Sequence, residues 1–183
     1  DDGGPDSQLW RSTDGGRTFS AVSVATPLHE PDVTPSVMVR VPPGLMALGT
    51  TQGRIVAWPP AAAGGGTESS APPSAASSGP SDAFRRPGIV ADDRLTDVGG
   101  GVSGPSGALV WGSVVAYSSP QAVGWLTADG VRFTAIPAGT FGPVAAYHYS
   151  RISGAIWADD RWVVVGERST NGRSRRSALV YTS

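Results

Sequence analysis

Apolar residues occur along this chain in short alternating or continuous runs that glycine, proline and aspartate interrupt. Such runs, rich in β-branched and aromatic side chains, are typical of β-strands, and no stretch combines a helical period with capping residues. The pattern predicts strands at residues 9–10, 19–24, 37–41, 45–48, 54–58, 109–117, 122–126, 152–157, 162–165 and 178–182. The chain is therefore predicted to be all-β, with antiparallel strands joined by tight turns.

A distinctive polar motif separates the first two predicted strands. Ser12, Asp14, Gly16, Thr18 and Phe19 form the pattern Ser-x-Asp-x-Gly-x-Thr-Phe. Glycine adopts a positive φ without a steric penalty, and an aspartate carboxylate accepts hydrogen bonds from the backbone of its own turn. We expect the hydroxyls of Ser12 and Thr18 to reinforce this turn and the ring of Phe19 to pack inward.

A shorter copy of the motif follows the predicted strand at residues 122–126. Thr127, Asp129, Gly130 and Phe133 repeat the hydroxyl, the carboxylate, the glycine and the aromatic ring, with one residue fewer between them. The last predicted strand leads into Ser183, where a third copy would begin. Self-similarity at a spacing of tens of residues is typical of propellers and solenoids.

The motif resembles the Asp box, or BNR repeat, of sialidase-like β-propellers. The resemblance implies a hairpin between strands three and four of a four-stranded antiparallel blade, away from the ligand-binding face. Residues 1–183 then form part of one β-propeller domain, a partial propeller of about three blade equivalents, whereas closed propellers have about four to eight blades. We expect the remaining blades of the same chain to complete it, because open blades leave exposed sheet edges.

Residues 61–82 differ in composition from the rest of the chain. They contain mainly Ala, Gly, Ser and Pro, with few bulky apolar side chains to offset the entropy of ordering. We interpret them as a flexible insertion, because predicted strands lie on both sides. A linker between domains is the alternative.

Composition excludes several classes of function. The formal net charge is −1, so the chain has no general attraction for nucleic acid. No apolar run is long enough to span a membrane. The chain has no Cys and only two His residues, which argues against a metal site. No motif indicates a cofactor. All basic residues are Arg, which is typical of a GC-rich bacterial genome; with the family resemblance, this suggests an extracellular or cell-envelope protein.

The expected blade geometry selects candidate ligand residues. Strands alternate in direction, so loops after strands two and four lie opposite the Asp-box turns, and function concentrates on such loops. The turn at Asp159 and Asp160 should lie on the Asp-box side. Loops between strands two and three include Gln121, Arg168 and Arg176. The residues predicted to bind ligand are Asp92, Asp93, Arg94, Tyr147, His148, Tyr149, Arg151 and Arg173.

Two classes of function fit these residues. The first is a non-catalytic propeller that recognises a glycan, an anionic small molecule or a protein surface, because Arg binds carboxylates and aromatic rings stack on sugars. The second is a glycoside hydrolase of the exo-sialidase or another Asp-box type. A sialidase-like mechanism needs a Tyr nucleophile, an assisting Glu and an acid/base Asp. Tyr147 or Tyr149, Glu167, and Asp92 or Asp93 are available, but their spacing does not select a catalytic set. We favour the non-catalytic function.

Overall fold

The structure, a computed structural model, consists of β-strands and turns. It describes residues 9–12, 14–22, 34–42, 44–51, 54–60, 88–91, 95–116, 119–143, 145–169 and 176–183. Within these ranges there is no helix, and hence none that could cross a membrane. The all-β prediction is confirmed.

The strands form antiparallel sheets in which neighbours in sequence are neighbours in space. β1 (Leu9–Arg11) pairs with β2 (Ser20–Val22) as a separate hairpin. The first sheet contains, in order, β3 (Thr34–Val41), β4 (Gly44–Thr51), β5 (Arg54–Trp58) and β6 (Gly88–Ala91).

The second sheet contains β7 (Leu95–Gly104), β8 (Gly107–Ala116), β9 (Ser119–Thr127) and β10 (Thr134–Ala135). The third contains β11 (Tyr149–Ala158), β12 (Arg161–Ser169) and β13 (Arg176–Thr182). Each sheet is open, with two edge strands.

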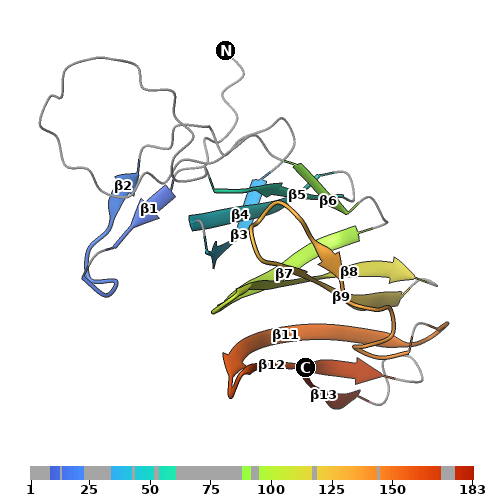
Figure 1. Cartoon of the computed structure of the whole chain (residues 1–183). Helices are drawn as coiled ribbons and strands as arrows, with labels where there is room; N and C mark the ends of the chain where they lie inside the picture. The colour runs from blue at the N-terminus through green and yellow to red at the C-terminus, as the bar shows by residue number, and fades with distance from the viewer. Residues whose placement is uncertain are drawn as a thin grey trace, which may run out of the picture.

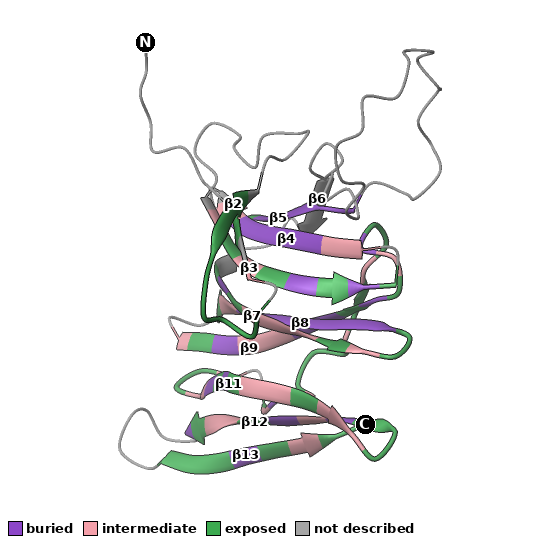
Figure 2. Cartoon of the chain, turned by 90° about the vertical axis from the view of Figure 1, so that its left-hand side faces the viewer, coloured by how far each residue is buried: buried purple, intermediate pink, exposed green. Residues whose placement is uncertain are grey.

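The three larger sheets stack face to face, with the second between the other two (Figures 1 and 2). One apolar cluster joins the first and second sheets and includes Met46, Leu48, Val110 and Trp125. Another joins the second and third sheets and includes Leu109, Trp111, Trp162 and Val164. Because alternate side chains of β8 point to opposite faces, this one strand contributes to both clusters, which explains its continuous apolar sequence.

Three consecutive glycines in β7 allow one of these clusters to form. The indole of Trp111 lies against Gly99 and Gly100, and a Cβ atom on Gly100 would come within 2.8 Å of Trp111 Cε2. The apolar pattern predicts no strand at residues 95–104, because glycine usually disfavours strands. The structure has β7 there, since the missing side chains provide the space that the Trp111 ring occupies.

The ends of the sheets follow the predicted alternation. His148 precedes β11 and Asp159 follows it, so the two residues lie at opposite ends of this strand. Trp162, beside the Asp159 turn, lines a common cleft with Asp129, and Gly130 approaches Met46 and Pro60 of the first sheet. The turns at Asp129 and Asp159 therefore share one end of the stack, as predicted.

Several residues predicted to lie in loops belong to strands instead. Tyr149 and Arg151 are in β11, Gln121 is buried in β9, Arg168 is in β12 and Arg176 is in β13. The apolar runs underestimate strand length, because backbone pairing continues past the last core residue into polar sequence.

The segment at 61–82 lies outside the described residues, so its predicted flexibility stays a prediction. The strands on either side of it, β5 and β6, pair within the first sheet.

Candidate functional site

The first Asp-Gly turn, residues 12 and 14–19, is held by hydrogen bonds that converge on two side chains. The backbone N–H groups of Arg17 and Thr18 each donate to Oδ1 of Asp14 at 3.0 Å, and the Thr18 hydroxyl donates to Oδ2 at 2.6 Å. The Ser12 hydroxyl donates to Asp14 and accepts from the Gly16 N–H at 2.7 Å. The hydrogen bonds from Thr18 and Ser12 lower the pKa of Asp14 well below its usual value.

The second Asp-Gly turn, residues 127–133, repeats this arrangement. Oδ1 of Asp129 accepts from the N–H groups of Val131 at 2.8 Å and Arg132 at 2.9 Å, and Thr127 Oγ1 accepts from the Gly130 N–H at 2.9 Å. The backbone hydrogen bonds from Arg132 and Val131 lower the pKa of Asp129. The same acceptors thus serve a turn that is one residue shorter.

The two aromatic residues that follow these turns differ in how far they are buried. Phe133 is partly buried and packs against the cluster between the first two sheets. Phe19 is 61% exposed, so the expectation that its ring packs inward is wrong. The physical reason is position: β1 and β2 pair with each other and lie to one side of the stacked sheets (Figure 1), so among the described residues the apolar clusters of the stack lie out of reach of Phe19.

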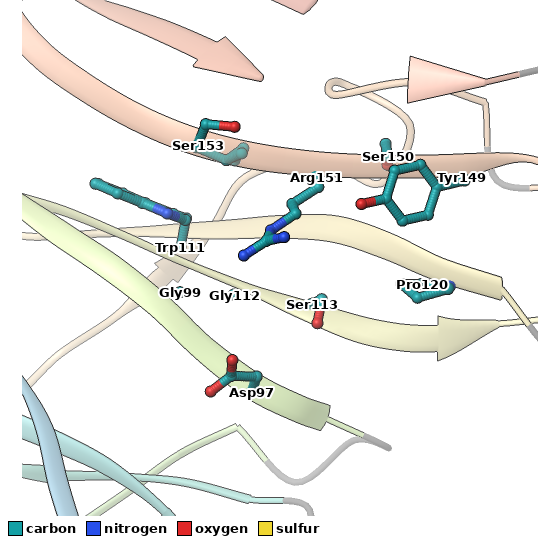
Figure 3. Close-up of a pocket in the computed structure, with 11 residues that line it drawn as sticks. Asp97, Gly99, Trp111, Gly112, Ser113, Pro120, Tyr149, Ser150, Arg151 and Ser153 are labelled. Carbon is teal, nitrogen blue, oxygen red and sulfur yellow. The ribbon is translucent and has the colours of Figure 1, made fainter. Parts of the chain in front are cut away.

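A cleft lies between the second and third sheets, toward the end opposite the Asp129 turn. It has a volume of about 470 Å³. One wall comes from β7, β8 and β9 and the other from β11. Figure 3 shows the Arg151 side chain extending from β11 into this space, with Trp111 on one side of it and Tyr149 on the other. The residues that line the cleft are Asp97, Gly99, Trp111, Gly112, Ser113, Pro120, Tyr149, Ser150, Arg151, Ile152 and Ser153.

A hydrogen-bonded cluster borders this cleft on the third sheet. The Tyr149 hydroxyl donates to Oε1 of Glu167 at 2.8 Å, and Arg176 forms a 3.2 Å ion pair with Oε2 of the same carboxylate. Burial, followed by the hydrogen bond to Glu167, raises the pKa of Tyr149. The phenol therefore holds its proton at neutral pH and acts as a donor.

The segment before β11 is anchored to the second sheet. Gln121 Nε2 donates to the backbone carbonyl of His148, and Ser150 Oγ accepts from the Ala122 N–H at 2.8 Å. Tyr147 has a φ of 63° and is 76% exposed, an unusual backbone conformation for a large residue. These contacts fix the edge of the cleft and leave the Tyr147 ring in solvent.

The structure brings together part of the predicted ligand set. Tyr149 and Arg151 line the cleft, while Tyr147 and His148 lie in the segment leading into β11. The remaining predicted ligand residues lie outside the described part of the chain; they are Asp92, Asp93, Arg94 and Arg173.

The sequence interpretation missed two important residues of the cleft. Asp97 and Trp111 lie within strands, whereas candidate ligand residues were sought in loops. Asp97 interrupts an otherwise weakly polar strand, but this signal becomes specific only when β11 is placed opposite it.

Comparisons with protein-family models, well-characterised proteins and solved structures gave no significant match to this chain. The function proposed below therefore depends on the geometry of the described residues.

Proposed function

We propose that this chain is part of a sialidase-like β-propeller that binds a ligand without catalysis. The architectural part of the proposal is supported by the stack of four-, four- and three-stranded meanders, each taken as a blade or part of one. The turns of Asp14 and Asp129 correspond to Asp boxes, with equivalent hydrogen bonds around each carboxylate. Export to the cell surface or exterior of a bacterium belongs to this proposal.

The cleft beside β11 is the observation on which the binding function rests. It places the guanidinium of Arg151 between two aromatic side chains, Trp111 and Tyr149, with serine hydroxyls nearby. Arg donates a fork of hydrogen bonds to carboxylates, and the half-buried ring of Tyr149 offers an apolar face to a sugar, while the buried Trp111 forms part of the cleft wall. The volume of the cleft is in the range of small-molecule sites. A glycan or a small anion fits this chemistry.

Isothermal titration calorimetry with glucuronate, N-acetylneuraminate and N-acetylglucosamine tests this function. We expect binding that Arg151→Gln weakens about tenfold, as for the loss of a charge-assisted hydrogen bond. Arg132→Gln is the matched control, because Arg132 lines a separate cleft with Asp129. Equal effects of the two variants, or the absence of binding, would contradict the assignment of this site.

A specific observation also favours glycoside hydrolysis as a second candidate. The Tyr149–Glu167 hydrogen bond would let Glu167 accept the phenolic proton while Tyr149 Oη attacks an anomeric carbon. The bond to the aglycone oxygen breaks, and this oxygen takes a proton from the acid/base aspartate, for which the resemblance offers Asp92 or Asp93. Water would then cleave the glycosyl–tyrosine bond. Release of 4-methylumbelliferone from its sialoside, lost in Tyr149→Phe, would support catalysis. Binding without release would support the first proposal.

A further inference from the structure

Two opposite charges face the cleft from its two walls. Asp97 lies on β7 of the second sheet and Arg151 on β11 of the third. Figure 3 shows the Asp97 carboxylate and the Arg151 guanidinium as separate groups on opposite sides of the opening. Among the described residues, neither has an ion-pair partner, in contrast to Glu167, which is paired with Arg176.

The surface between these charges suits a small ligand. The buried Trp111 and Gly112 and the exposed Gly99 line it on the second sheet, and Ser153 of β11 adds an exposed hydroxyl group. A ligand with a single charge would complement one wall and leave the opposite charge partly desolvated without a partner, which is unfavourable. A ligand with both charges complements both walls.

We infer that the ligand of this cleft is a zwitterion, with its carboxylate at Arg151 and its ammonium group at Asp97. This inference rests on the proposed binding function and specifies its ligand class. The shared chemistry occurs in the ends of short peptides and in amino sugars that carry a carboxylate. An extended dipeptide spans about 7 Å at 3.3–3.6 Å per residue, so its two charges lie at opposite ends of the molecule.

Five small molecules test the two charges separately and distinguish a peptide ligand from an amino-sugar ligand. Glycylglycine carries both charges, N-acetylglycylglycine keeps the carboxylate, and glycylglycinamide keeps the ammonium group. Muramic acid is the zwitterionic sugar, and glucuronate is its singly charged counterpart. Binding to the full 183-residue chain is followed by the indole N–H signal of Trp111 in a ¹H–¹⁵N spectrum, assigned with Trp111→Phe, because this ring lies in the cleft wall.

We expect glycylglycine or muramic acid to bind at least about tenfold more tightly than its singly charged counterparts. Asp97→Asn should abolish the advantage of the ammonium group, and Arg151→Gln that of the carboxylate. Asp160→Asn and Arg132→Gln should change neither, because both residues lie at the other end of the sheets. Tighter binding of glycylglycine indicates a peptide ligand, and tighter binding of muramic acid indicates an amino-sugar ligand.

Two results would overturn the inference. If glucuronate or N-acetylglycylglycine binds as tightly as the zwitterions and Asp97→Asn has no effect, the cleft is a simple anion site; the proposed function then stands and the zwitterion is wrong. If the zwitterions leave the Trp111 signal unchanged, the inference is also wrong. The calorimetric glycan titration then decides the proposed function independently.

Discussion

The run of glycines in β7 provides a graded test of how the second and third sheets pack. Gly100→Ala places a Cβ atom 2.8 Å from Cε2 and 3.1 Å from Cη2 of Trp111, and closer still to Cζ2. Trp111 is 6% exposed and belongs to the cluster between these sheets, so its ring cannot move away freely. Overpacking of this kind costs about 1–3 kcal/mol, and we expect a loss of unfolding free energy in that range.

The neighbouring glycines are matched controls for this substitution. A Cβ on Gly99 would lie 3.0 Å from Trp111 Cδ1, so Gly99→Ala should cost less than Gly100→Ala. A Cβ on Gly101 would lie 3.4 Å from Val37 and Val39, near an ordinary contact. Gly101→Ala should be neutral or stabilising by up to about 0.5 kcal/mol, because alanine loses less entropy in a strand.

Urea unfolding monitored by far-ultraviolet circular dichroism measures all three variants. Repeating Gly100→Ala in a Trp111→Phe background should reduce its cost by about 1 kcal/mol, because the shorter ring no longer meets the new methyl group. A neutral Gly100→Ala, or an equal cost in both backgrounds, would refute the proposed contact between this glycine and the indole.

Four further predictions concern the turns and the segment at 61–82. Asp129→Ala should lower the melting temperature more than Asp129→Asn, which keeps an acceptor for two backbone N–H groups; equal losses would contradict the hydrogen-bonding role. Because folding lowers the pKa of Asp129, the charged carboxylate contributes stability above about pH 4, and this contribution should be lost as the pH falls further. Thermal melts at a series of pH values measure the loss, and Asp129→Asn should lack this pH-dependent contribution. Asp160 has a φ of 58° in the β11–β12 turn, so Asp160→Gly should gain about 0.5 kcal/mol and Asp160→Val should lose stability in urea unfolding; the reverse order would exclude backbone strain. Deletion of residues 61–82 should change the melting temperature by only a few degrees, since loop-closure entropy varies slowly with length, and a large loss would show that the segment packs on the fold.

Local chemistry explains why much of the strand order could be predicted from the sequence. Asp129 and Gly130 define a turn through hydrogen bonds within a few residues, and these survive the loss of one residue relative to the turn of Asp14. Alternating apolar runs likewise identify most strands, because each side chain's face follows from its position in the strand. The sequential antiparallel order of the sheets follows from such local signals.

Contacts between sheets could not be predicted in this way. Phe19 and Phe133 occupy equivalent motif positions, yet only Phe133 reaches an apolar cluster. Tyr149 and Glu167 are paired by the register of β11 and β12, and Asp97 faces Arg151 because two sheets stack. The turns and the alternation of the strands follow from the amino-acid sequence, since they depend on neighbouring residues. Which polar side chains share a cleft becomes evident only in the folded chain, because it depends on register and packing between segments distant in the sequence.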